Sequence, residues 1–144
     1  MWTKPRATAV LLLLILTGAL FSAIGLFGPP GISKMTITHT VLFQFKAGLP
    51  VEDVKAACAR FLQLADTCAH PTRGGTYIIS LKGGKDHSPE GLQNGITHGF
   101  VVEFASVEDR DYYVAKDPAH MAFVKSIEDL VEKAIVVDFT DGEY

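Results

Sequence analysis

Histidine side chains carry most of the chemical information in this sequence of 144 residues. His120 follows Asp117-Pro118-Ala119, which predicts the start of a helix, because aspartate is a favoured N-cap and proline is favoured at the first helical position. The positive end of a helix opposes protonation, so His120 should be neutral near pH 7. A neutral imidazole can accept a proton, which makes His120 a candidate general base. The alternative is a solvent-facing histidine in the first helical turn.

Two further histidines, His39 and His98, each stand in a row of alternating apolar residues that is typical of a strand. They can point into one enclosed space, or each can be a buried side chain that bonds to the backbone. The histidine spacing matches no metal-binding motif, so we expect no metal. The G-x-S-x-G, Walker and dinucleotide-binding motifs are missing from the sequence, and we expect no cofactor.

The elements that position these side chains follow from the periodicity of the apolar residues. Alternation predicts strands over residues 36–46, 76–82, 98–104 and 134–140. A helical period predicts helices over residues 51–67, 106–114 and 117–131, the second of which opens with a capping box at Ser106 and Asp109. The order β-α-β-β-α-β is that of the ferredoxin-like α+β fold. One sheet face then lacks cover, which predicts a homodimer that packs sheet against sheet.

The first 34 residues differ in composition from the rest of the chain. Residues 9–27 form an apolar run of 19 residues, close to the roughly 20 needed to cross a bilayer. We therefore expect a hydrophobic helix and linker in residues 1–34, acting as a single-pass membrane anchor or signal, followed by one domain in residues 35–144. The alternatives are secretion after cleavage of a signal peptide, and a cytosolic protein if translation starts at Met35.

Charge excludes one class of partner. All 16 acidic residues lie after Met35, against ten of the 13 lysines and arginines, so the domain carries a net charge of −6. Nucleic-acid-binding domains present a basic surface, and we expect no nucleic-acid partner here.

Cys58 and Cys68 are ten residues apart in and just beyond one predicted helix, which is about 15 Å of rise and too far for a disulfide.

Four segments resemble one known family. They are T-H-T-V-L-F-Q-F-K (38–46), T-H-G-F-V-V-E-F (97–104), Y-Y-V-A-K-D-P-A-H-M-A-F-V (112–124) and V-V-D-F (136–139). Together they look like the stress-responsive dimeric α/β-barrel (A/B barrel) domain, over essentially all of residues 35–144. The resemblance implies a homodimer whose two sheets close into a barrel, with a pocket between sheet and helices in each subunit.

Within this family the sequence is similar to plant olivetolic acid cyclase, which catalyses an intramolecular aldol cyclisation of a linear polyketide. The proposed base of that enzyme matches His120, and its strand histidines match His39 and His98. The resemblance implies a site for a hydrophobic, oxygenated small molecule in which His120 abstracts a proton alpha to a carbonyl group. In this scheme Tyr113 hydrogen-bonds the developing enolate, and His39, His98 and Phe61 line the pocket.

Two departures from the cyclase pattern bear on this hypothesis. Phe61 stands where the cyclase has a tyrosine, and Val114 stands six residues before the base, where its second functional tyrosine lies. An extra residue in Lys116-Asp117 would let Tyr113 take that second place. The alternatives are a non-catalytic stress-response dimer with a vestigial pocket, and oxidative chemistry like that of dimeric barrels that bind haem.

Overall fold

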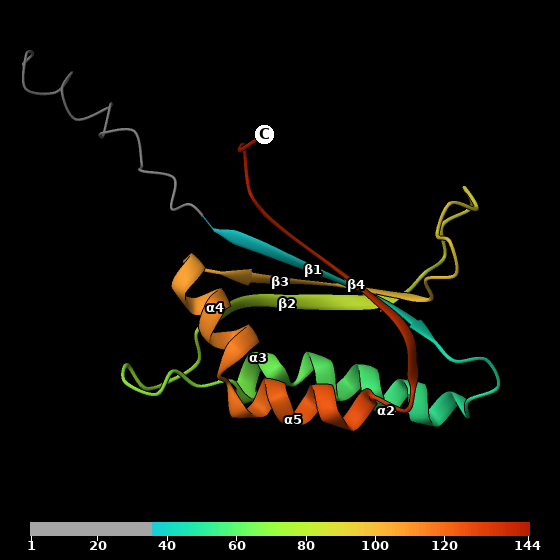
Figure 1. Cartoon of the computed structure of the whole chain (residues 1–144), viewed down its shortest axis with the longest axis horizontal. Coiled ribbons are helices and arrows are strands. Elements are labelled where there is room, and N and C mark those ends of the chain that lie inside the picture. Colours follow the sequence, from blue (N-terminus) through green and yellow to red (C-terminus); the bar gives the residue numbers. More distant parts are fainter. Residues whose placement is uncertain (1–35) are drawn as a thin grey trace, which may run out of the picture. The chain divides into compact units, whose positions relative to one another are not determined.

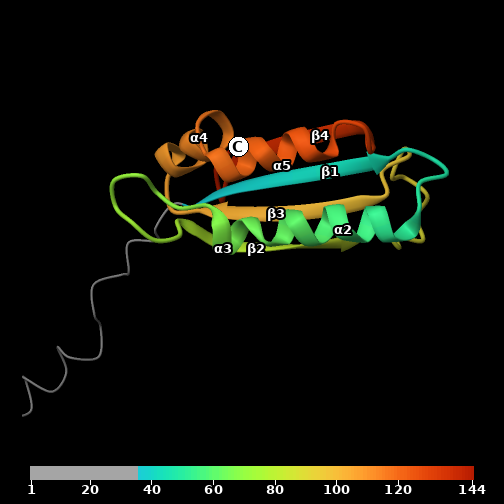
Figure 2. The same ribbon diagram turned by 90° about the horizontal axis from the view of Figure 1, so that it is seen from below.

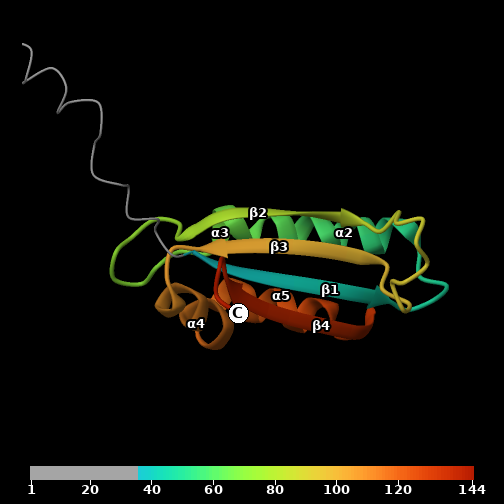
Figure 3. The same ribbon diagram turned by 90° about the horizontal axis from the view of Figure 1, so that it is seen from above.

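The computed structural model describes residues 36–144. Within this range the chain forms, in order, β1 (Ile37–Phe45), α2 (Val51–Leu62), α3 (Leu64–Thr67), β2 (Ile78–Lys85), β3 (His98–Phe104), α4 (Val107–Ala115), α5 (Pro118–Ile127) and β4 (Val131–Thr140). The strands form one antiparallel sheet in the order β2-β3-β1-β4 (Figure 3). This is the ferredoxin-like α+β fold, and it confirms the predicted fold class.

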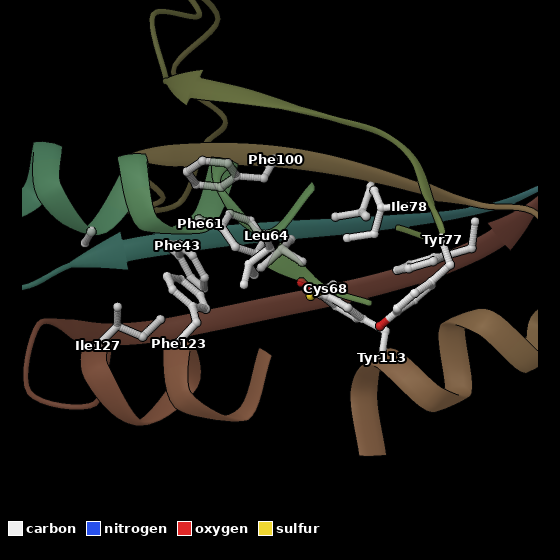
Figure 4. Packing of buried hydrophobic residues seen from close by; sticks show 14 of the residues in the cluster. Phe43, Phe61, Leu64, Cys68, Tyr77, Ile78, Phe100, Tyr113, Phe123 and Ile127 are labelled. Atoms are coloured by element: carbon white, nitrogen blue, oxygen red, sulfur yellow. The ribbon is translucent and has the colours of Figure 1, made fainter. Parts of the chain in front are cut away.

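The helices cover one face of the sheet. Figures 1 and 2 show α2 and α5 side by side along the strands, with α4 at one end. β1 alternates between buried residues that face the helices and partly exposed residues that face away. An aromatic cluster lies between the sheet and the helices, and it consists of Phe43, Phe61, Phe100 and Phe123 (Figure 4). The ring centroid of Phe61 is 4.5 Å from that of Phe100 and 4.9 Å from that of Phe123. Aromatic rings bury large areas, so this cluster anchors both helices to the sheet.

The opposite face of the sheet, here called the open face, has no helix over it within the described residues (Figure 3). It carries Thr38, Thr40, Val137 and Phe139, which pair across β1 and β4. Val137 is 52% exposed and Phe139 is 49% exposed. Side chains this apolar are seldom left uncovered side by side on an isolated domain.

The two N-caps predicted at Ser106 and Asp117 are confirmed. The Ser106 hydroxyl accepts a hydrogen bond from the backbone N–H of Asp109 at 3.2 Å. The Asp117 carboxylate accepts hydrogen bonds from the backbone N–H groups of Ala119 at 2.8 Å and His120 at 3.1 Å. These caps satisfy N–H groups that have no partner inside the helix. His120 is therefore fixed in the first turn of α5.

Several boundaries differ from the sequence-based expectation. The first helix is divided at Gln63 into α2 and α3, and β2 runs from Ile78 through Gly83 to Lys85 instead of over residues 76–82. The last helix, α5, ends at Ile127 and not at residue 131, which belongs to β4. Gly83 pairs with Phe100 of β3, and a Cβ atom there would lie only 2.2 Å from Cδ1 of Phe100. Close packing between β2 and β3 therefore requires glycine at this position, just beyond the end of the predicted strand.

The membrane segment predicted over residues 9–27 lies outside the described residues. In residues 36–144 the structure contains no helix of sufficient length and apolar character to span a bilayer. The described part of the chain thus gives no support to the predicted single-pass membrane anchor.

Candidate active site

A cavity of about 1010 Å³ lies between β1, β4, α4 and α5. Most of its wall is apolar, and the residues that form this part include Val41, Phe43, Phe61, Phe123, Ile127 and Val136. Its polar end is formed by His39, Arg110, His120 and Asp138. Ligand sites in proteins usually combine such an apolar wall with a few convergent polar groups, at volumes of about 300–1,000 Å³. The cavity can therefore hold a hydrophobic molecule of moderate size.

His39 is held by a carboxylate at the polar end of the cavity. Its Nδ1 lies 2.6 Å from Oδ1 of Asp138, and Arg110 contacts the other oxygen of the same carboxylate. His39 and Asp138 are direct partners in the antiparallel register of β1 and β4, so both side chains point to the helix-covered face. A carboxylate can only accept a hydrogen bond, so Nδ1 of His39 carries the proton. Nε2 of His39 is left as the nitrogen that can interact with a ligand.

His120 lies close to His39, with the ring of Tyr113 beside both. The Tyr113 ring centroid is 4.0 Å from that of His120 and 5.8 Å from that of His39. Burial lowers the pKa of His120, the nearby His39 lowers it further, and the Asp117 carboxylate opposes this shift. This direction agrees with the neutral His120 that the helix start predicted, but burial rather than the helix end is the main cause.

Tyr113 is fully buried and does not line the cavity. Its hydroxyl group has no hydrogen-bond partner among the described residues, and its side chain lies in the core with Cys68 and Tyr77 (Figure 4). Burial raises the pKa of Tyr113, and Cys68 and Asp117 add to the shift. Val114 lines the cavity instead, because successive residues of a helix point in directions about 100° apart. The structure thus places Tyr113 beneath the two histidines and away from the space for a ligand.

The two other predicted pocket residues lie in different places. Phe61 lines the cavity from α2, whereas His98 does not line it. In the antiparallel register of β1 and β3, His98 is the partner of Phe43, four residues from His39 along β1. At about 3.3 Å per residue, roughly 13 Å separates the two histidines along the sheet. They share a sheet face, as the alternation predicted, but lie toward opposite ends of it.

Asp138 and Arg110 belong to the site and were missed by sequence reasoning. Asp138 is the single charged residue in the otherwise apolar run of residues 134–139, and that isolation was the available signal. Arg110 gave no signal, because it stands in a run of four charged residues, 108–111, near the start of α4. Within residues 36–144, no group of three or more histidine, cysteine, aspartate or glutamate side chains is arranged to hold a metal ion.

The residue that caps α5 is itself buried next to the site. Asp117 is only 1% exposed, and its second carboxylate oxygen accepts a hydrogen bond from the Tyr77 hydroxyl at 2.7 Å. The Cys68 thiol shares this environment, and burial together with the Asp117 carboxylate raises its pKa to about 12. Asp117 therefore links the core beneath β2 to the turn that carries His120.

Comparison with known proteins identifies the family. The model of the family described as "Stress responsive A/B Barrel Domain" matches residues 37–141. The chain belongs to this family. A relative of this A/B barrel domain, the stress-response A/B barrel domain-containing protein HS1 of Arabidopsis thaliana, is 29% identical over 107 residues, which are 74% of this chain and 91% of HS1.

Solved structures show the same fold as this A/B barrel domain. The At3g17210 protein of Arabidopsis thaliana has a TM-score of 0.62 at 28% identity, covering 75% of this chain and 97% of that one. A hydroxynitrile lyase from Passiflora edulis has a TM-score of 0.65 at 23% identity, covering 77% and 97%. A protein described as dimeric and ferredoxin-like, from Bacteroides fragilis, has a TM-score of 0.54 at 22% identity, covering 73% and 95%. The latter two likenesses are of fold.

Proposed function

We propose that this A/B barrel domain is an enzyme that removes a proton alpha to a carbonyl group in a hydrophobic, oxygenated small molecule. The reaction we assign is an aldol cyclisation of a polyketide-like substrate, as the resemblance to the plant cyclase implies. The observation that carries the proposal is the placement of His120 and the Asp138-bound His39 at the polar end of one apolar cavity.

In this mechanism His120 is the general base. Its lowered pKa keeps the imidazole neutral, and it takes a proton from the carbon next to the carbonyl group. This step requires His39 with a proton on each ring nitrogen: Nε2 then donates a hydrogen bond to the developing enolate oxygen, and the Asp138 carboxylate balances the charge of the ring. The enolate carbon then attacks a second carbonyl carbon of the same molecule. The new alkoxide takes the proton back from His120, so the cyclisation consumes no other reactant.

Tyr113 takes a different role from the one that the resemblance implied. Because its hydroxyl group is enclosed in the core, we assign it as a positioning residue whose ring supports His120 and His39, and we assign the enolate contact to His39.

One observation favours a non-catalytic stress-response protein as the second candidate. Phe61 and Val114 line the cavity where the cyclase pattern has tyrosines, so the wall offers fewer hydroxyl groups to a substrate.

The test uses proton exchange, which requires no knowledge of the natural substrate. Exchange of the alpha protons of 2-nonanone in D₂O, followed by NMR, should be faster with wild-type protein than in buffer. His120→Ala should lower the protein-dependent rate by about 10²–10⁴-fold, the usual contribution of a general base. Thermal unfolding of the same variant separates a lost base from a damaged fold. Equal rates for wild type and a folded His120→Ala variant would show that His120 is not the base.

We also propose that the domain forms a homodimer through the open face. The half-exposed Val137 and Phe139 support this, as does the description of the Bacteroides fragilis neighbour as dimeric. Analytical ultracentrifugation at micromolar concentration should give the mass of a dimer. Val137→Glu, which places a charge on the open face, should give a folded monomer, whereas the same change at exposed Met121, on the helix side, should not. A wild-type monomer would refute the proposal.

A further inference from the structure

Arg110 lines the polar end of the cavity together with His39 and His120, but it takes no direct part in the proposed mechanism. We propose that Arg110 is a second substrate-binding residue, which shares with His39 the two oxygen atoms of a 1,3-dicarbonyl group. This proposal rests on the proposed function, because it concerns the oxygen atoms of the same enolate in the same cavity. Asp138 then holds both donors in place.

The guanidinium group of Arg110 retains N–H donors beyond those used in its ion pairs. Its Nε lies 2.8 Å from Oδ1 of Asp111, and its Nη1 contacts Oδ2 of Asp138. A guanidinium group has five N–H donors, so both N–H groups of Nη2 and one of Nη1 have no acceptor among residues 36–144. The side chain is 22% exposed, and polar groups that are this enclosed usually have a partner. A ligand in the cavity can supply the acceptor.

A single carboxylate brings this guanidinium group next to His39. Nδ1 of His39 lies 2.6 Å from Oδ1 of Asp138, and Arg110 contacts Oδ2, the oxygen on the same carbon atom. The two donors therefore reach the cavity side by side, one from β1 and one from α4. A ligand with one oxygen atom can use His39 alone. A 1,3-dicarbonyl can contact both residues, because its planar enolate holds two oxygen atoms on the same side.

The chemistry of the base favours a substrate of this kind. A proton between two carbonyl groups is much more acidic than a proton next to one, because the negative charge left behind spreads over two oxygen atoms. Burial lowers the pKa of His120 and makes it a weak base, which is better matched to such a carbon acid than to a simple ketone. His120 takes the proton from the carbon between the carbonyl groups, and the electron pair of the C–H bond forms the enolate. His39 and Arg110 then each donate a hydrogen bond to one enolate oxygen.

The test compares two ligands of equal chain length, 2-nonanone and nonane-2,4-dione. Equilibrium dialysis against the full-length protein at pH 7.5 measures the affinity of each. Nonane-2,4-dione offers an acceptor to both donors, so its dissociation constant should be at least tenfold lower than that of 2-nonanone. Equal or weaker binding of nonane-2,4-dione would overturn the proposal, and this comparison needs wild-type protein only.

Arg110→Met distinguishes a contact with the ligand from an indirect effect through Asp138. It removes the second donor, so it should weaken the binding of nonane-2,4-dione at least tenfold and that of 2-nonanone less than threefold. If Arg110 only holds Asp138, the variant disturbs His39 and weakens both ligands equally, which would overturn the proposal. Thermal unfolding checks that the variant is folded.

The matched control is Arg60→Met. It makes the same substitution on α2, at a residue that does not line the cavity, and should leave both affinities unchanged. An effect equal to that of Arg110→Met would overturn the proposal, because net charge alone would then explain the result.

These outcomes are separable from those of the proposed function, because dialysis measures binding without turnover. A selective loss of nonane-2,4-dione binding in Arg110→Met, without proton exchange that depends on His120, would refute the proposed reaction alone. Exchange that depends on His120, with equal losses of both ligands in Arg110→Met, would refute the role of Arg110 alone.

Discussion

Removing the Asp117 carboxylate should destabilise the domain and misplace His120 at the same time. In Asp117→Ala, the N–H groups of Ala119 and His120 lose their cap, which costs about 1 kcal/mol. The Tyr77 hydroxyl is left buried without its acceptor, which costs about 1–3 kcal/mol more. The expected total is about 2–4 kcal/mol. At about 4 °C per kcal/mol for a domain of this size, the melting temperature should fall by roughly 8–16 °C.

The matched control is Asp117→Asn. Asparagine caps helices as well as aspartate does, and its amide group can donate to the Tyr77 hydroxyl oxygen, so we expect a loss of about 1 kcal/mol or less. Urea unfolding of the full chain measures all three proteins. Tyr77→Phe completes a double-mutant cycle with Asp117→Ala, in which the coupling should be about 0.5–3 kcal/mol. A loss below about 0.5 kcal/mol in Asp117→Ala would refute the role of this carboxylate as a buried cap.

The same variant has a functional consequence. His120 is held in the first turn of α5 by the bond from its N–H to Asp117, so the freed turn should no longer hold the imidazole against Tyr113. At temperatures where Asp117→Ala is still folded, alpha-proton exchange should therefore fall at least tenfold, while Asp117→Asn stays near wild type. A folded Asp117→Ala variant with full activity would show that His120 is placed by other contacts.

Two further predictions follow from burial at the site. Because the pKa of His120 is lower in the folded chain than its ordinary value near 6.5, the unfolded chain binds this proton more readily. The stability that His120 contributes is therefore complete above about pH 6.5 and decreases as the pH falls toward the folded-state pKa. The urea midpoint of the wild-type protein should accordingly fall more steeply between pH 7 and 5 than that of His120→Gln. Tyr113→Phe removes a buried hydroxyl group that has no partner, so it should stabilise the domain by about 1 kcal/mol and change alpha-proton exchange by less than about threefold. A hundredfold loss of exchange in Tyr113→Phe would return the enolate contact to Tyr113.

The features that could be predicted from the sequence are those that depend on neighbouring residues. Alternation placed His39 and His98 on the helix-covered face, because side-chain direction in a strand is set by position alone. The caps at Ser106 and Asp117 were also visible, since each side chain bonds to N–H groups two or three residues away. The rotation of α4 about its axis was harder to predict, and this rotation turns Val114 rather than Tyr113 toward the cavity.

The features that could not be predicted depend on strand register. Whether His98 joins His39 is decided by which residue of β3 lies opposite each residue of β1, and alternation on two separate strands carries no such information. The bond between His39 and Asp138 joins residues 99 positions apart, through the pairing of the first and last strands. Arg110 adds a third element to that contact. The carboxylate that orients His39 could therefore be recognised only once the sheet was assembled.

β4 is the outermost strand on its side of the sheet, and within the described chain it pairs with β1 alone. It supplies Ala134 and Val136 to the cavity wall, whereas the aromatic cluster of the core comes from other elements. Substitutions at these two positions can therefore change the shape of the cavity while the packing of the core is kept. Mutation and selection can act on the shape of the cavity at these two positions and on the proposed acid–base chemistry at His39, His120 and Asp138 as nearly independent traits. A library confined to Ala134 and Val136 is thus the economical starting point for retuning this domain toward new molecules.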